Sequence, residues 1–285
     1  MSDTQQRARK QAAPKMDVVP VRHWGRGIGA AVVVVLVVLA VVELATNPNF
    51  EWSVVGKYLF DVNVLEGLLL TLEMTVIGMV LSVALALVIG VMRISPSRII
   101  AGFAAAWVFV LRGVPLIVLL IFLGNLGLFF TDFRLGVPFT DITWWSVPAK
   151  EVVTPFWASV VGLALAGSGY MAEVVRAGLL SIGRGQHEAA KALGLDVSGT
   201  LRHIVLPQAL RVIIPPLGNE FIGMLKASAI VSVIAGGDLL TVVLGLSGLN
   251  FRTIEMLIVA TIWYLLVIAV FSVVQVLLER RTAER

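Results

Sequence analysis

Six long runs of apolar residues dominate the sequence. The first run, at 28–46, carries no charge until Glu43, and its length of about 20 residues is enough to cross a hydrocarbon core of roughly 30 Å. We therefore expect an all-α polytopic membrane protein with about six transmembrane helices. The other five runs are at 68–92, 99–130, 155–180, 212–235 and 253–278.

The first and third runs differ from a simple span. A signal peptide has an apolar region of about 7–15 residues close to its start, whereas 27 residues precede the first run here, so we expect an uncleaved helix. The third run is too long for one span. We expect it to begin as a cytosolic extension and to cross the bilayer in its second half.

The 22 Lys and Arg residues are unevenly distributed. If the N-terminus is cytosolic, 16 of them fall in the inner segments 1–27, 93–98, 176–211 and 279–285, and 4 fall in the outer segments. Cytoplasmic loops of membrane proteins are enriched in Lys and Arg. The distribution therefore predicts a multi-pass protein with both termini in the cytosol.

The composition excludes an ordinary soluble enzyme. Apolar residues make up 58% of the chain and charged residues 14%, against about 45–50% and about 25% in soluble domains. The chain has no Cys and three scattered His, so we expect no metal centre and no cofactor. The net charge of +4 is typical of basic cytoplasmic loops, and we expect no nucleic-acid partner.

The short motifs of metal and nucleotide sites are absent, because the residues do not have the required spacing. The pair His187-Glu188 is not a zinc-protease motif, because the second His would have to stand at Lys191. Residues 25–29 lack the strand and the third-glycine spacing of a dinucleotide site, and the sequence contains no phosphate-binding Gly-x-x-x-x-Gly-Lys-Ser/Thr. We therefore expect a chain that is not an enzyme and does not bind ATP itself.

The segment between the fourth and fifth runs carries the main functional signal. Residues 185–194 are rich in good helix formers, and Gly194 stands where a left-handed C-terminal cap would be. Residues 196–200 offer N-cap candidates for a second helix. A helix with three alanines suits docking into a groove of a partner, although an amphipathic helix lying on the bilayer is the alternative.

This segment resembles the coupling loop of the permease subunits of bacterial ATP-binding-cassette (ABC) importers. The string Glu188-Ala189-Ala190, Gly194, Ile204 and Leu206-Pro207 matches every fixed position of their EAA signature. Four stretches in order are similar to the polar amino acid uptake subfamily, and the likeness covers about residues 64–280. The stretches are 111–116, 168–176, 185–190 and 206–210 with 215–221.

The resemblance implies a fold and a domain order. The implied fold is the five-helix core of type I ABC importers at 64–280. This core includes a cytosolic coupling loop at 182–206 that docks into the ATPase. The helix at 28–46 is additional to that core, and residues 1–27 form a cytosolic basic tail. The coupling residues implied are Gly185, Glu188, Ala189, Ala190, Gly194, Ile204, Leu206 and Pro207.

The function implied is that of a permease subunit in the bacterial inner membrane, forming the pathway for polar or charged amino acids. The implied partners are an ABC ATPase dimer that hydrolyses ATP, a second permease subunit of the same or a related kind, and a periplasmic or lipid-anchored solute-binding protein. One departure weakens any inference about the substrate, because Lys226-Ala227-Ser228-Ala229 lacks the acidic residue and the threonine that many members have there.

Polar residues inside the apolar runs indicate a pathway. A charge in a spanning helix costs on the order of 3 kcal/mol, so it usually faces a cavity or a partner. The run 212–235 is the most polar, and we expect its helix to be broken or kinked at Pro215-Pro216, which lack backbone donors. The candidate pathway residues are Arg112, Asn219, Glu220, Met224, Lys226 and Ser228.

Individual charges allow more than one interpretation. Glu220 can meet a substrate ammonium group or can pair with a cation between subunits. Arg112 either snorkels to the inner surface or lines the pathway. Glu173 and Arg176 lie three apart on one helix and can pair, mainly as a structural contact. Glu73 has no evident partner.

Three rival functions can be compared with this one on the sequence alone. A permease for another small polar solute would keep every feature described. A channel or secondary transporter would have no reason to keep the EAA loop. A membrane-bound enzyme would need a nucleophile or a metal constellation, and the sequence offers neither.

Overall fold

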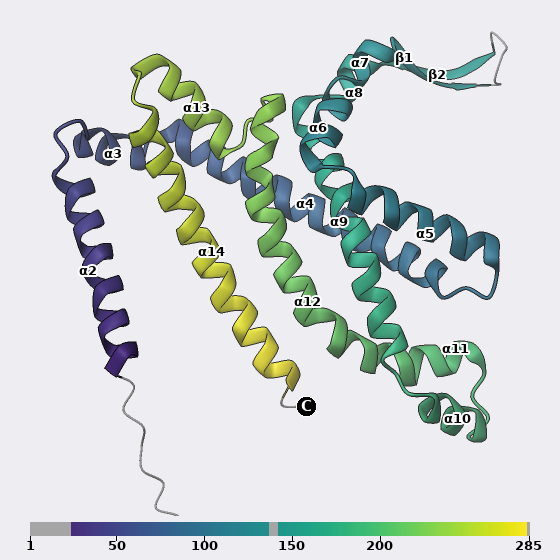
Figure 1. Cartoon of the computed structure of the whole chain (residues 1–285). Coiled ribbons are helices and arrows are strands. Elements are labelled where there is room, and N and C mark those ends of the chain that lie inside the picture. Colours follow the sequence, from purple (N-terminus) through teal and green to yellow (C-terminus); the bar gives the residue numbers. More distant parts are fainter. Residues whose placement is uncertain (1–23, 137–141, 284–285) are drawn as a thin grey trace, which may run out of the picture. The chain divides into compact units, whose positions relative to one another are not determined.

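The computed structural model describes residues 24–136 and 142–283, and this part of the chain is almost entirely helical (Figure 1). It forms two compact units, one ending at Glu51 and one beginning at Trp52. The elements are α2 (Trp24–Thr46), α3 (Trp52–Leu59), α4 (Val62–Arg93), α5 (Arg98–Gly113), α6 (Leu116–Gly124), α7 (Leu126–Phe129), β1 (Asp132–Gly136), β2 (Thr143–Pro148), α8 (Ala149–Val152), α9 (Pro155–Leu180), α10 (Arg184–Ala192), α11 (Val197–Thr200), the π-helix η1 (Leu201–Val205), α12 (Leu206–Ala227), the 3₁₀-helix η2 (Ser228–Ile234), α13 (Leu239–Asn250) and α14 (Thr253–Ala283).

Among the described residues, four helices are long and apolar enough to cross a membrane, or five if the bent pair α5–α6 is one span. The multi-pass helical fold is therefore confirmed, but the expected count of six is not. The apolar part of α2 in the first unit, Ile28–Glu43, is shorter than these four. Its valine and leucine side chains are exposed, which in a membrane protein means contact with lipid or another chain.

The long run at 99–130 folds as two helices rather than one. The axes of α5 and α6 differ by 97° across a break at Val114-Pro115. Val114 has extended backbone angles (φ −78°, ψ 125°), because the ring of a following proline clashes with a helical conformation. The expectation that this run is not one simple span is confirmed.

Glycines allow the central helices of the second unit to approach closely. A Cβ atom added to Gly90 of α4 would lie 2.8 Å from the Cβ of Val175 in α9. A Cβ atom added to Gly167 of α9 would lie 2.7 Å from the Cε of Met224 in α12. Small residues at helix crossings are the usual way to pack helices in lipid, where burial of apolar surface gives little driving force.

The helix α12 continues through both Pro215 and Pro216. Of the two outcomes expected there, the break is wrong, and the kink stays a prediction. Prolines are tolerated inside membrane helices where neighbouring helices hold the segment, and α12 packs against α4, α9 and α14. The helical path then tightens into η2 and ends at Ala235, which has a left-handed backbone.

A buried carboxylate that the sequence did not indicate begins α13. Asp238 is fully buried and accepts a hydrogen bond from the backbone N of Leu240 at 3.0 Å, as an N-cap does. Its other oxygen accepts from the hydroxyl of Thr241. The hydroxyl of Thr71 in α4 accepts from the backbone N of Leu239 at 2.9 Å. These bonds satisfy the first donors of α13 where water is absent.

Candidate functional site

The segment between α9 and α12 folds as the two expected helices, α10 and α11. Gly194 has φ +78°, its N–H donates to the carbonyl of Lys191 at 3.0 Å, and the N–H of Leu195 donates to the carbonyl of Ala190 at 3.1 Å. These two bonds form a Schellman cap at the end of α10. The predicted left-handed cap at Gly194 is confirmed.

Two further side chains fix the shape of this loop. The Oδ1 of Asp196 accepts from the backbone N of Gly199 at 2.8 Å and caps α11, as predicted for the segment 196–200. The Nε2 of Gln208 in α12 donates to the Oε1 of Gln186 in α10 at 3.2 Å. This link, which the sequence does not indicate, ties the loop to the start of α12.

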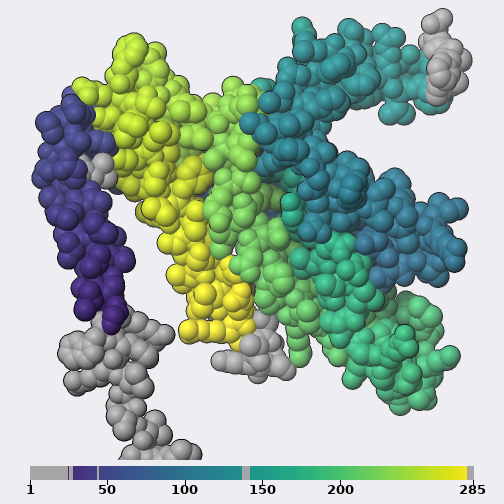
Figure 2. All heavy atoms as spheres, in the orientation of Figure 1, coloured from purple at the N-terminus to yellow at the C-terminus, as the bar shows by residue number. Residues whose placement is uncertain are grey.

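The EAA positions lie mostly on the surface of the loop. Gly185, Glu188 and Ala189 are exposed, whereas Ala190 is 2% exposed and packs inward. At about 100° per residue, Gly185, Ala189 and Ala192 share one face of α10, which carries almost no side-chain bulk. The helices α10 and α11 lie at one end of the second unit (Figure 2), and the three residues of this thin face are exposed. Of the remaining positions, Ile204 is partly buried, and Leu206 and Pro207 are exposed.

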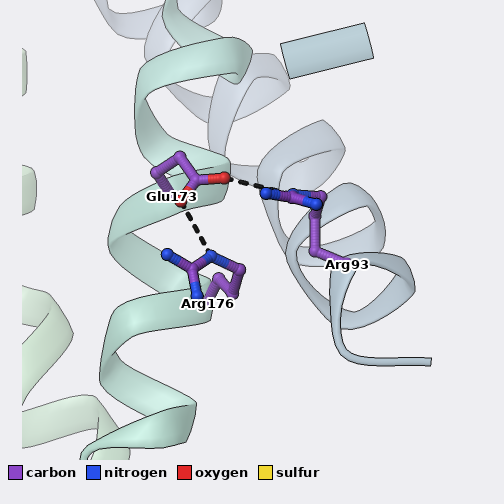
Figure 3. Close-up of polar contacts among 3 residues, drawn as sticks. All are labelled: Arg93, Glu173 and Arg176. Carbon is purple, nitrogen blue, oxygen red and sulfur yellow. Dashed lines mark hydrogen bonds and ion pairs between the residues drawn. The ribbon is translucent and has the colours of Figure 1, made fainter. Parts of the chain in front are cut away.

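An ion-pair cluster joins α4 to α9 (Figure 3). The Oε2 of Glu173 lies 2.8 Å from the Nε of Arg176, and its Oε1 lies 3.2 Å from the Nε of Arg93. All three side chains are at least two-thirds buried. The predicted pair is confirmed, but Arg93 was missed because it lies 80 residues away in the sequence.

The polar residues of α12 divide into two sets. Asn219 and Lys226 are exposed, Glu220 is partly buried, and a Cβ atom at Gly223 would meet nothing within 4 Å. These residues form an open polar face. The Oδ1 of Asn219 accepts from the Nε2 of Gln275 in α14 at 2.9 Å, a contact that sequence analysis did not indicate.

Met224 and Ser228 are not on that polar face. Met224 is 6% exposed and packs in the core between α4, α9 and α12. Ser228 is fully buried, and its hydroxyl donates to the carbonyl of Leu225 at 2.6 Å. In this structure, both residues pack the helix behind the polar face.

Arg112 lies at the end of α5 and is exposed. The centre of its guanidinium group lies 5.1 Å from the ring centre of Tyr170 in α9, a cation–π distance. Arg112 therefore lies against α9, whereas Glu73 is exposed on α4 and still has no assigned role. Within residues 24–136 and 142–283, no group of three His, Asp or Glu side chains could hold a metal ion.

The matching family and the named relatives of this chain agree with each other. Residues 78–284 match the family described as "Binding-protein-dependent transport system inner membrane component". The chain is 36% identical over 271 residues to the arginine transport system permease protein ArgU of Corynebacterium glutamicum, covering 94% of this chain and 84% of that protein. It is 31% identical over 233 residues to the glutamine transport system permease protein GlnP of Escherichia coli, covering 82% and 98% respectively.

Solved structures agree with the fold. The chain superimposes on an amino acid ABC transporter crystallised with histidines with a TM-score of 0.64 and 34% identity, covering 77% of this chain and 94% of that chain. It superimposes on the MetNI methionine ABC transporter with a TM-score of 0.58 and 20% identity, covering 79% and 97%, which supports the fold alone. The resemblance to ABC importer permeases is confirmed, and the chain belongs to the family of binding-protein-dependent transport system inner membrane components.

Proposed function

We propose that this chain forms the pathway for polar or charged amino acids in an ABC importer of the bacterial inner membrane. The observation that carries the proposal is the capped helix α10, which presents the EAA positions on an exposed, thin-faced loop. Relatives named as arginine and glutamine permeases support an amino acid as the substrate. A permease for another small polar solute would share the loop but not the substrate.

The proposed complex has three kinds of partner. An ABC ATPase dimer binds at the coupling residues around α10 and supplies the energy of ATP. A second permease subunit, the same or related, completes the pathway. A periplasmic or lipid-anchored binding protein delivers the substrate at the opposite end of the second unit, where β1 and β2 lie (Figure 1).

The sharpest test of this assembly is purification of the chain from native membranes. We expect an ATPase and a solute-binding protein to co-purify, and titration calorimetry on that binding protein to show amino acid binding. Transport that persists after deletion of the co-purifying ATPase would instead support a channel or a secondary transporter. Binding of a different solute would support a permease of an ABC importer for that solute instead of for an amino acid.

The proposed domain order is a cytosolic basic tail at 1–27, an additional membrane helix at 28–46 and the permease core at 64–280 with its coupling loop at 182–206. The core and its loop rest on the resemblance to type I ABC importers, and the cytosolic placement of the tail and the loop rests on the distribution of Lys and Arg. Residues 1–23 lie outside the described part of the chain.

This order predicts a labelling pattern. Because the chain has no Cys, single substitutions are clean probes. In intact cells, an impermeant maleimide is expected to label Lys57→Cys in α3 and not Ala283→Cys at the end of α14. Permeabilised cells provide the control, since both positions should then react. Labelling of position 283 in intact cells would contradict the cytosolic C-terminus.

The pathway is proposed to run along the open face of α12. Asn219, Glu220 and Lys226 face it, and Arg112 of α5 is assigned to the same pathway. Met224 and Ser228 contribute by packing behind this face. A carboxylate at Glu220 suits an α-ammonium group or a cationic side chain of the substrate.

Removal of the charge at Glu220 tests this role. Glu220→Gln keeps the shape, so we expect transport to fall about tenfold, the loss of roughly one hydrogen bond to a charged group. Assembly and basal ATP hydrolysis should stay near normal, as should all three properties in Glu66→Gln, an exposed position on α4. If Glu220 instead pairs between subunits, the same change should weaken the complex in detergent while a nearby cation change restores it.

A further inference from the structure

A pocket of about 860 Å³ lies beside the coupling loop, on different residues from the polar face of α12. The ends of α4 and α9, the helix α10 and the segment 195–205 line this open pocket. Its volume is within the range of about 300–1,000 Å³ that is typical of ligand sites. Its apolar walls are formed by Ile94, Leu179, Leu180, Ile182, Leu201 and Val205.

One face of α10 adds basic groups to this apolar pocket. Arg184, His187 and Lys191 all line it, and their spacing of three and four residues places them on one side of the helix. The thin face with Gly185 and Ala189 points elsewhere. The helix can therefore present its thin face to an ATPase while its basic face remains in the pocket.

The cationic groups have no carboxylate partner in the described part of the chain. Neither Arg184 nor Lys191 forms an ion pair there. Asp196 also lines the pocket, but its Oδ1 accepts the N–H of Gly199 at 2.8 Å in the cap of α11. The pocket is therefore complementary to an anion.

The apolar walls distinguish a lipid from a free anion in water. The side chains of Leu180 and Ile94 are 59% and 42% exposed at the ends of helices that are apolar enough to span a membrane. A free phosphate would gain nothing from these walls, whereas an acyl chain would cover them. Basic pockets between membrane helices on the cytoplasmic side are suited to anionic lipid headgroups.

We propose that this pocket binds one anionic phospholipid of the inner leaflet. Arg184, His187 and Lys191 hold its phosphate, and an acyl chain lies along Ile94 and Leu180. The lipid then bridges α10 to the ends of α4 and α9, directly behind the face offered to the ATPase. This inference rests on the proposed cytosolic placement of α10, which the labelling at position 283 tests independently.

The test uses the whole transporter with its ATPase subunits, in nanodiscs of phosphatidylglycerol and phosphatidylcholine. Native mass spectrometry measures how much phosphatidylglycerol stays bound after release from the disc. Because each basic residue at a membrane surface contributes about 1 kcal/mol, Arg184→Gln/Lys191→Gln is expected to weaken phosphatidylglycerol binding about 30-fold. The matched control Arg98→Gln/Arg202→Gln removes two exposed charges outside the pocket and should bind like the unmodified transporter.

Three results would overturn the proposal. The pocket variant could retain as much phosphatidylglycerol as the unmodified transporter, or the control variant could lose as much as the pocket variant. The pocket variant could also lose the ATPase subunits while its bound phosphatidylglycerol is unchanged, which would make this face of α10 a protein contact. A failed labelling prediction at position 283 would contradict the proposed topology without altering the measured lipid binding.

Discussion

Replacement of Gly194 by valine is expected to abolish substrate-stimulated ATP hydrolysis by the assembled transporter. Gly194 has φ +78°, a left-handed conformation that a β-branched residue resists. Loss of the Schellman cap changes the direction of the chain at the end of α10. A displacement of about 1 Å can reduce a reaction rate about 100-fold, here the rate of substrate-stimulated ATP hydrolysis. The measurement is ATP hydrolysis in proteoliposomes with and without substrate, after equal membrane insertion has been verified.

Two variants separate backbone strain from bulk. Gly194→Asn should retain most of the stimulation, because asparagine tolerates a left-handed backbone. Gly102→Val should be unaffected, since a Cβ atom there meets nothing within 4 Å and its φ is ordinary. Normal stimulation in Gly194→Val would refute the assignment of α10 as the coupling helix.

Replacement of Glu173 by leucine is expected to lower the melting temperature of the detergent-purified transporter by about 5 °C. The substitution leaves Arg93 and Arg176 facing each other without the carboxylate that lies 3.2 Å and 2.8 Å from them. These side chains are largely buried, so water screens the repulsion only in part. Differential scanning fluorimetry on matched preparations measures the shift.

Neutralising the whole cluster is the control. Arg93→Gln/Glu173→Gln/Arg176→Gln removes all three charges, so its melting temperature should recover most of the loss seen in Glu173→Leu. If the Glu173→Leu variant has the same melting temperature as the unmodified transporter, the cluster does not hold α4 to α9. A triple variant as unstable as Glu173→Leu would assign the effect to packing rather than to charge.

The features predicted correctly depend on signals between near neighbours. Gly194 follows a run of helix formers, and Asp196 stands three residues before the N–H that it caps. The long run at 99–130 exceeds one span by its length alone, although the sequence analysis did not place the bend that the structure shows at Pro115. In each case the physical cause lies within a few residues of its effect.

The features missed depend on distant parts of the chain. Arg93 reaches Glu173 across 80 residues, and Asp238 looks like an ordinary loop residue until Thr71 and α13 enclose it. Of the break or kink expected at Pro215-Pro216, the break does not occur for the same reason, because α12 packs against α4, α9 and α14 and stays helical. Such outcomes are set by tertiary contacts that one sequence does not display.

The unbroken passage of α12 through two prolines has a mechanical consequence. Pro215 and Pro216 have no N–H, so α12 lacks two of the bonds that give other helices their bending stiffness. Its loop end is tied to α10 through Gln208, and its other half carries Glu220. We therefore expect α12 to bend more easily at its midpoint than a helix without prolines. Its two halves can then tilt by different amounts when α10 moves.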